Sequence, residues 1–213
     1  MTGIVSAPLA PDNIKANLNT KLIGREVIVY NSTSSTNNIA AEYAKNKKND
    51  GLVIFAEEQT AGRGRAGAKW HSGRAESILC SILLADCTLN PELLSLTSAV
   101  AVANAVGGEA KIKWPNDIIL NGKKVAGILL ESRAYNNRIA YTIGVGINCH
   151  QTKDSFPSEL QHLATSIDIE SGSICNRISL AKRLLTSMDH WLEIAEKNSK
   201  EIIDQWRKLG LAE

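Results

Sequence analysis

The stretch Asp117-Ile-Ile-Leu-Asn-Gly-Lys-Lys-Val-Ala-Gly-Ile-Leu-Leu-Glu131 carries the clearest fold signal in the chain. Its Asn121-Gly122 pair stands between two apolar runs, and Asn-Gly favours the tight two-residue turn of a β-hairpin. We therefore predict antiparallel strands over residues 117–120 and 123–131. The run from Arg138 to Asn148 predicts a third strand, joined to the second through a short polar loop.

The rest of the chain divides into strands upstream and helices downstream. Apolar runs predict four more strands, at 25–30, 52–56, 77–84 and 111–114. Helical signals lie at 11–18, after a cap at Ser35 or Thr36, at 91–106 from Pro91 onward, at 181–195 and at 199–209. This order predicts an α+β fold in which helices pack on a mixed, largely antiparallel sheet.

Length, charge and cysteine content limit the class of protein. The 213 residues suit one substantial domain, and the formal net charge of +2 is low for a protein that coats nucleic acid. The cysteines (Cys80, Cys87, Cys149 and Cys175) form no C-x-x-C pair, so we expect free thiols in a reducing compartment. The apolar runs are too short to span a membrane, and the first residues do not resemble a secretory signal. We therefore expect a cytoplasmic protein.

The loop Gln59-Thr-Ala-Gly-Arg-Gly-Arg-Ala-Gly-Ala-Lys-Trp70 is the segment richest in chemistry. Glycines let the backbone approach an anion, and Arg63 and Arg65 add charge and paired donors that suit carboxylate or phosphate. The spacing matches neither a Walker loop nor a dinucleotide-binding fingerprint. A flexible basic loop that contacts solvent or RNA explains this segment alone equally well.

Three later segments add to this pattern. Lys113-Trp-Pro-Asn-Asp117 places an amide and a carboxylate in a turn, which is either a metal or amine site or simply a structural turn. In Gly122-Lys-Lys-Val-Ala-Gly-Ile-Leu129, a lysine stands near Gly127, within reach of a ligand or of solvent. In Ile143-Gly-Val-Gly-Ile-Asn148, glycines inside a strand indicate that a ligand or another backbone approaches closely.

Together with Ser35-Thr36-Asn37, these blocks resemble the biotin–protein ligase family over roughly residues 12–195. The resemblance implies a fold like the biotin–lipoate ligases and class II aminoacyl-tRNA synthetases. It also implies an enzyme, a biotin–[biotin carboxyl carrier protein] ligase. Such an enzyme uses ATP with Mg²⁺ to convert biotin to biotinyl-5′-AMP, and then transfers biotin to a lysine of a carrier domain of a carboxylase.

The resemblance also assigns residues by their place in the matching blocks. It implies biotin contacts from Ser35, Thr36, Asn37, Gln59, Gly62, Arg63, Gly64, Arg65, Lys124, Gly127 and Gly144. It implies nucleotide contacts from Arg63, Arg65, Trp70, Asn116, Asp117, Lys124 and Asn148. The catalytic candidates are Arg63, Arg65, Lys124 and Asp117, of which Asp117 is also the candidate Mg²⁺ ligand and Arg65 the candidate clamp on the adenylate. Trp114, Ile128, Leu129 and Val145 are candidates for apolar pocket walls.

Departures from the family pattern shape the remaining expectations. Ala66 stands where many bacterial members have a second arginine. We expect a lead-in over 1–20 without a DNA-binding domain, a catalytic domain over 21–198, and a helix over 199–213 where the family's small β-barrel would begin. We expect no nucleic-acid or membrane partner. Because bacterial members often pair through sheet edges, we expect a homodimer with the 138–148 strand as a candidate edge.

Three rival functions stay open. A lipoate-type ligase or octanoyl transferase would share the fold, although the Arg-Arg-x-x-Gly-Gly-Gly block usual in those proteins is absent from this sequence. A relative that binds biotin or biotinyl-AMP without transferring it would share the site residues. A nucleic-acid-binding module is disfavoured by the near-neutral charge and by the lack of interleaved aromatic and basic residues outside the loop.

Overall fold

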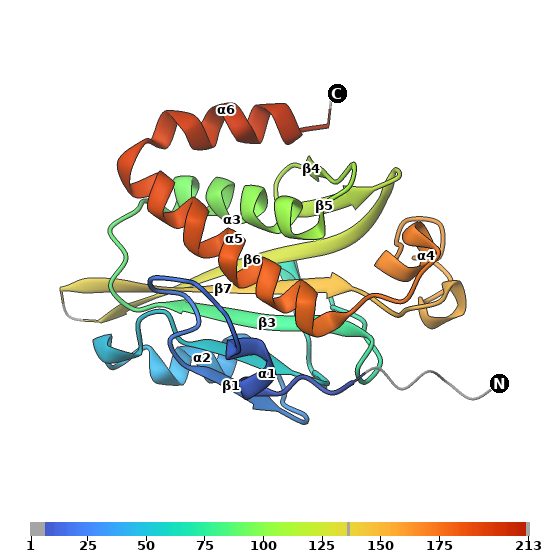
Figure 1. Cartoon of the computed structure of the whole chain (residues 1–213), viewed down its shortest axis with the longest axis horizontal. Helices are drawn as coiled ribbons and strands as arrows, with labels where there is room; N and C mark the ends of the chain where they lie inside the picture. The colour runs from blue at the N-terminus through green and yellow to red at the C-terminus, as the bar shows by residue number, and fades with distance from the viewer. Residues whose placement is uncertain (1–6, 136, 212–213) are drawn as a thin grey trace.

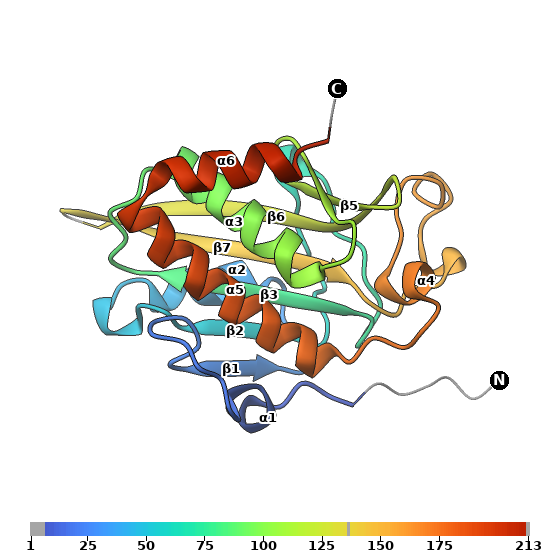
Figure 2. The same ribbon diagram turned by 45° about the horizontal axis from the view of Figure 1, so that its top comes forward.

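The computed structural model describes residues 7–135 and 137–211, which form a seven-stranded sheet with helices on both faces (Figures 1 and 2). The strand order is β1-β2-β3-β7-β6-β5-β4. The bounds are β1 Val27–Tyr30, β2 Val53–Ala56, β3 Ser77–Leu84, β4 Lys111–Lys113, β5 Asp117–Leu120, β6 Lys123–Tyr135 and β7 Arg138–Asn148. Only β1 and β2 pair in parallel, so the predicted mixed, largely antiparallel sheet is confirmed.

The hairpin predicted from Asn121-Gly122 is present between β5 and β6. Both turn residues have positive φ, 48° for Asn121 and 79° for Gly122, as a type I′ turn requires. Strand β6 is four residues longer than predicted, because its end continues to pair with β7 as far as Tyr135 opposite Arg138. The predicted polar loop between these strands includes Asn136, which lies outside the described residues.

The prediction that the 138–148 strand forms a sheet edge is wrong. Strand β7 lies in the middle of the sheet, between β3 and β6, and the outer strands of the described sheet are β1 and β4. From Ala140 to Val145, every residue of β7 is buried. Strands that are covered on both faces have apolar residues at nearly every position, and the residues from Ala140 to Val145 fit that central place.

The helices cover the sheet unequally (Figures 1 and 2). Their bounds are α1 Pro11–Lys15, α2 Thr36–Tyr43, α3 Pro91–Val106, α4 Ile167–Ser171, α5 Arg177–Lys197 and α6 Ser199–Leu209. Side chains alternate between faces along β2: Val53 and Phe55 pack in the core under α3 and α5, while Ile54 packs with Ala40 of α2 and with Ala44, which caps the end of that helix. The helices α3 and α5 therefore cover one face, and α2 covers the other.

Two details of the helices differ from prediction. Helix α1 ends at Lys15 instead of continuing to residue 18, because Asn17 adopts a left-handed conformation with φ 57°. Ser35 occupies the predicted N-cap position of α2 but makes no capping hydrogen bond through its side chain.

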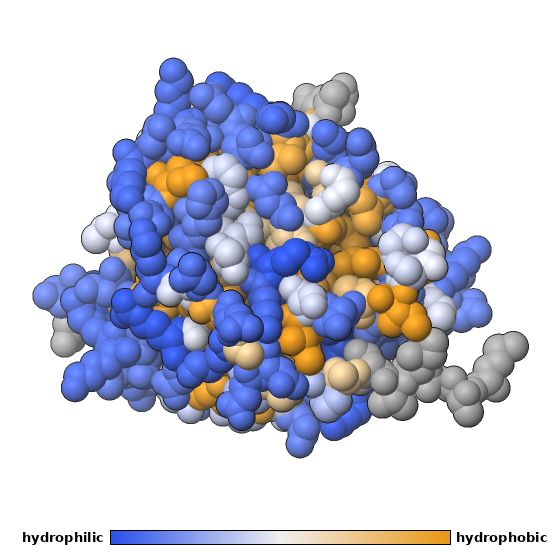
Figure 3. Space-filling view, in the orientation of Figure 1, coloured by the Kyte–Doolittle hydropathy of each residue, from blue (hydrophilic) through white to orange (hydrophobic). Residues whose placement is uncertain are grey.

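Viewed from the side of α5 and α6, the surface of the protein is mainly hydrophilic, with hydrophobic patches between the hydrophilic side chains (Figure 3). No helix of the described residues is both long and apolar enough to cross a membrane.

Candidate functional site

Three cavities lie in a row along one face of the central strand β7. Alternate residues of a strand share a face, and Thr142, then Gly144 and Gly146, then Asn148 line successive cavities. We call them the side cavity (280 Å³, at Thr142), the inner cavity (240 Å³, at the two glycines) and the apolar cavity (480 Å³, at Asn148).

The inner cavity brings together most of the predicted site residues. Its lining includes Ser35, Thr36, Asn37, Gln59, Arg63, Gly64, Arg65, Trp70, Asn116, Asp117, Lys124, Gly127 and Gly144. They come from the start of α2, the 59–70 loop, the β4–β5 turn and strands β5, β6 and β7. Segments far apart in sequence thus converge on one cavity.

Two predicted site residues lie outside the inner cavity lining. Gly62 pairs with Trp70 at the base of the loop, where its carbonyl accepts a 3.1 Å hydrogen bond from the Trp70 N–H. Asn148 lines the apolar cavity, and its Nδ2 donates to the Thr165 carbonyl at 2.9 Å. Asn116 lines the inner cavity, but its Nδ2 donates a hydrogen bond within the protein, to the Ile128 carbonyl at 2.9 Å.

One end of the inner cavity is neutral and polar. Gln59 Oε1 accepts hydrogen bonds from the Thr36 N–H at 2.8 Å and from its hydroxyl at 3.0 Å. The Thr36 Oγ1 also lies 2.7 Å from the Ser81 hydroxyl. These bonds leave the Gln59 amide N–H groups and the Ser35 hydroxyl, which is not used as a helix cap, to face a ligand.

Asn37 is held from three sides and contributes shape more than free hydrogen bonds. Its Oδ1 accepts from the Ser81 hydroxyl at 2.5 Å, and its Nδ2 donates to Glu131 Oε2 at 2.7 Å. A side chain at Gly144 would place Cβ 2.5 Å from Asn37 Oδ1, so only glycine admits this packing. The close approach predicted from the strand glycines is therefore made by a side chain, not by another backbone.

The Trp70 side chain covers part of the β6–β7 strand pair. Gly127 and Gly146 face each other in the β6–β7 ladder, and the Trp70 ring lies over both. A Cβ at Gly146 would lie 2.5 Å from the ring, and one at Gly127 would lie 3.1 Å from it. The two glycines thus create the depression that seats the indole.

The boundary between the inner and apolar cavities is charged. Lys124 and Asp117 line both cavities, and Lys124 Nζ lies 2.7 Å from Asp117 Oδ1. Lys124 also lies over the Trp70 ring at 5.9 Å and passes close to Gly127, as the hairpin sequence suggested. The neighbouring Lys123 lines neither cavity. Lys124 is therefore the hairpin lysine that lines both cavities.

The glycine-rich loop closes over the inner cavity with its two arginines in different environments. The loop folds back on itself through Gly64 N–H to the Ala68 carbonyl at 2.7 Å. Arg63 Nη2 donates to Asn38 Oδ1 at 2.9 Å and lies 3.4 Å from Glu131, at the polar end. Arg65 lines the cavity with no protein partner among the described residues. Arg65, and not Arg63, is the arginine whose charge is available to a ligand.

Apolar groups form the walls between the two ends. Ile128, Leu129 and Val145 line the inner cavity with Cys80, although Ile128, Val145 and Cys80 also belong to the hydrophobic core under α3 and α5. Burial raises the pKa of the Cys80 thiol well above its usual value, so this wall is neutral. Trp114 does not belong to the wall: it is 65% exposed and packs edge-on against Trp206.

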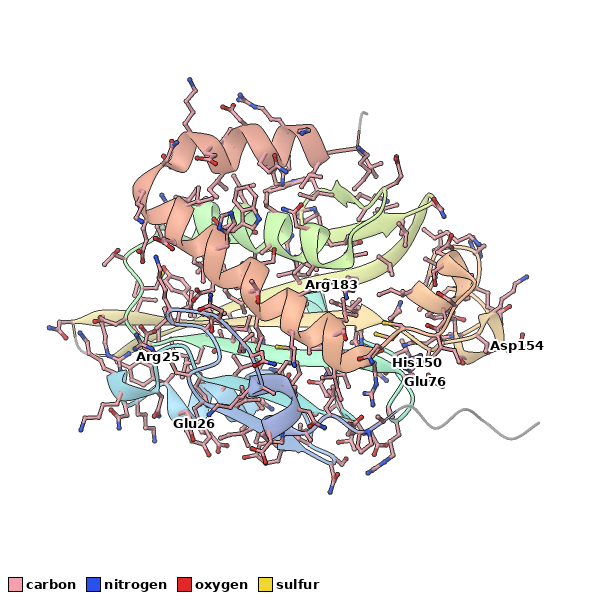
Figure 4. The ribbon with its side chains drawn as sticks, viewed as in Figure 1. Arg25, Glu26, Glu76, His150, Asp154 and Arg183 are labelled. Carbon is pink, nitrogen blue, oxygen red and sulfur yellow. The ribbon has the colours of Figure 1, made fainter. Side chains whose placement is uncertain are left out.

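The chain just beyond Asn148 is fixed by hydrogen bonds to Glu76, the residue before β3. The N–H groups of Cys149 and His150 both donate to the Glu76 carbonyl, at 3.0 and 2.8 Å, so Glu76 and His150 lie together (Figure 4). His150 Nδ1 lies 2.8 Å from Asp168 Oδ2 in helix α4. These contacts hold Asn148 at the mouth of the apolar cavity.

The sequence reasoning missed Ser81, Glu131, Cys80 and Lys69. Ser81 and Glu131 bond to Asn37, whereas Cys80 and Lys69 line the inner cavity. In the sequence each is an ordinary strand or loop residue, and only the strand register and the loop closure bring it to the site. The whole arrangement suits a ligand with a neutral polar head, an apolar middle and an anionic tail near Lys124 and Arg65.

The fold and these cavities define a ligand-binding domain built on a mixed sheet. The chain belongs to the biotin/lipoate A/B protein ligase family, whose sequence profile matches residues 29–148, more than half of the chain. A Mycobacterium tuberculosis biotin–[acetyl-CoA-carboxylase] ligase is 32% identical over 197 residues, which is 85% of this chain and 71% of that protein. These matches confirm the family indicated by the sequence motifs.

Two further comparisons agree. A Bacillus spizizenii bifunctional ligase/repressor BirA is 40% identical over 185 residues, covering 83% of this chain. This chain spans just over half (57%) of the length of that relative. The structure of the Aquifex aeolicus biotin protein ligase in complex with biotin and ATP matches with a TM-score of 0.75 and 27% identity, over 88% of this chain and 79% of that one.

Proposed function

We propose that this chain activates biotin with ATP to biotinyl-5′-AMP and transfers the biotin to a lysine of a carrier protein. The observation that carries the proposal is the order of chemistry along the inner cavity. A ureido head suits Ser35, Thr36 and Gln59, a thiophane ring and valeryl chain suit the apolar walls, and a carboxylate suits Lys124 and Arg65. The family match and the named biotin ligases support it.

In the activating step, a biotin carboxylate oxygen attacks the α-phosphorus of ATP and pyrophosphate leaves. Two anions must approach each other, and charge accumulates on the phosphoryl oxygens. Lys124 and Arg65 lower that repulsion because they are fixed cations beside the carboxylate end of the cavity. The role of the protein is therefore positioning and charge stabilisation.

In the transfer step, the carrier amine attacks the acyl carbon, the bond to AMP breaks, and the amine loses a proton. Asp117 lies at the boundary of the two cavities, where it holds Lys124 at 2.7 Å. We propose that Asp117 orients Lys124 in the first step and orients the incoming amine in the second. The loop and the Trp70 ring exclude water from the labile anhydride.

We propose that the apolar cavity receives the nucleotide. It joins the inner cavity through Trp70, Asp117 and Lys124, and apolar side chains such as Phe156 and Leu160 offer a surface for a base. Among the described residues no group of three acidic, histidine or cysteine side chains could hold a metal ion. Mg²⁺ is often bound by substrate phosphates with one or two carboxylates, and Asp117 is the carboxylate placed to assist.

Four calls about the wider protein are also part of this proposal. Residues 21–198 form the catalytic domain, which the family match over 29–148 supports. The acceptor is a biotin carrier domain of a carboxylase, as the name of the Mycobacterium relative suggests. The four free cysteines support a cytoplasmic location. A homodimer remains part of the proposal, with an outer strand such as β1 or β4 in place of β7.

Biotin-dependent exchange of radiolabelled pyrophosphate into ATP tests the activating step directly. We expect exchange that requires both biotin and Mg²⁺ with the 213-residue chain. Exchange followed by transfer to a carrier domain would support both steps. Calorimetric binding of biotin without exchange would reduce the chain to a biotin-binding relative, and the absence of both would overturn the proposal. Exchange that depends on lipoate in place of biotin would reassign the substrate.

Replacing Arg65 with glycine is expected to release the adenylate. Among the described residues Arg65 makes no side-chain hydrogen bond or ion pair, so its charge is free to hold the adenylate phosphate. Without it the intermediate would escape and label bystander lysines. The measurement is biotin incorporated into an added non-carrier protein, compared with wild type. Arg74→Gly, which removes an exposed arginine outside the inner cavity, is the control. If Arg65→Gly still labelled only the carrier, Arg65 would not be the clamp.

A further inference from the structure

The side cavity and the inner cavity are separated by two side chains, Asn37 and Arg63, which line both. Glu131 lies behind this partition and lines the side cavity only. Its carboxylate reaches Asn37 Nδ2 at 2.7 Å and Arg63 Nη2 at 3.4 Å. A single carboxylate thus touches both parts of the partition.

We propose that Glu131 is a positioning residue that keeps the biotin pocket shaped and closed, an inference that rests on the proposed function. It fixes the Asn37 amide with Oδ1 toward Ser81, and Ser81 in turn contacts Thr36 at the polar end. It also draws the Arg63 side chain toward the partition, so that the glycine-rich loop is fastened at its first arginine. Glu131 touches no substrate in this arrangement.

The two contacts of Glu131 differ in weight. Asn37 is buried, with 4% of its surface exposed, and without Glu131 its Nδ2 would keep only a long 3.5 Å bond to the Leu129 carbonyl among the described residues. The ion pair with Arg63 is longer, and both side chains are about 40% exposed (39% and 40%), so water screens it. The contact that orients Asn37 should therefore contribute more to the shape of the pocket than the contact that holds Arg63 and the glycine-rich loop.

Because the contacts with Asn37 and Arg63 differ in strength, two substitutions of Glu131 should have different effects. Glu131→Gln keeps an oxygen acceptor for Asn37 but loses the charge that faces Arg63, and we expect biotin affinity within about threefold of wild type. Glu131→Ala loses both contacts and opens the partition to water from the side cavity. We expect biotin affinity to fall about tenfold or more, because a buried amide loses its partner.

Calorimetric titration with biotin alone measures these affinities without requiring turnover. Tryptic cleavage at Arg63 and Arg65 in the ligand-free protein gives a second readout that is independent of biotin, and it should accelerate in Glu131→Ala. The control is Glu58→Ala, which removes a glutamate of comparable exposure paired with Arg74 at 3.7 Å, away from the inner and side cavities. Thermal unfolding of each variant checks that the fold is intact.

A double substitution tests the route of action. If Glu131 acts on the loop through Arg63, Glu131→Ala should not accelerate tryptic cleavage at Arg65 further in a protein that already carries Arg63→Ala. Additive acceleration would overturn that part. The proposal as a whole would be overturned if Glu131→Ala bound biotin within twofold of wild type and was cleaved at the wild-type rate. Failure of the wild-type protein to bind biotin would instead overturn the proposed function, while the cleavage assay would still test the partition.

Discussion

Replacement of Lys124 with alanine is expected to lower biotin-dependent pyrophosphate exchange by about 100- to 1000-fold. Lys124 Nζ stands at the boundary between the inner and apolar cavities, 2.7 Å from Asp117 and over the Trp70 ring. It is therefore a cation placed where a carboxylate in the inner cavity and a phosphate in the apolar cavity would meet. Its loss also leaves the Asp117 carboxylate facing two incoming anions, so repulsion is added where attraction is removed.

The chain supplies a matched control at the adjacent position. Lys123 belongs to the same hairpin and carries the same charge, but it lines neither cavity. Lys123→Ala should keep exchange within about twofold, since isolated exposed charges contribute little. If both lysine variants lost activity equally, the general positive charge of the hairpin would matter and the specific placement of Lys124 would not. If Lys124→Ala retained exchange, the proposed charge stabilisation would be wrong.

Local signals in the sequence account for much of the fold. Asn121-Gly122 determines its turn because few residues adopt positive φ at two successive positions, and the β5–β6 hairpin follows from it. Helix α3 begins at Pro91 and helix α5 follows the predicted spacing. The turn and the helices depend on residues close together in the chain, and those local relations can be read directly from the sequence.

The site residues could be predicted only where residue type and local spacing together indicate ligand binding. Glycines and arginines in the 62–70 loop are recognisable as a group, and Lys124 is recognisable beside Val-Ala-Gly. Ser81 and Glu131 are not, because a serine or glutamate in a strand acquires its role from register. The different environments of Arg63 and Arg65 likewise depend on how the loop closes. Long-range pairing thus decides which polar groups meet a ligand.

Replacement of Arg177 with methionine is expected to lower the free energy of unfolding by about 3–5 kcal/mol. Arg177 is 1% exposed, and its Nη1 lies 2.7 Å from Glu57 Oε2 in the interior. The other Glu57 oxygen accepts the Leu9 N–H at 2.6 Å, and Arg177 also donates to the Ser77 carbonyl at 3.3 Å. The pair therefore joins the N-terminal segment, β3 and α5 at one buried point.

The cost arises from the partner that remains and not from the contact that is lost. Without the guanidinium, Glu57 is a buried carboxylate with no counter-charge from Arg177, and taking a lone charge out of water is highly unfavourable. Urea unfolding monitored by circular dichroism measures the loss, and Lys47→Ala, which breaks an exposed pair with Asp86, should cost no more than about 1 kcal/mol.

The double variant Arg177→Met with Glu57→Gln separates these two explanations. A glutamine at position 57 keeps an acceptor for the Leu9 N–H but carries no charge, so the double variant should be more stable than Arg177→Met alone. If the double variant were as unstable as the single one, lost packing of the Arg177 stem would be the cause.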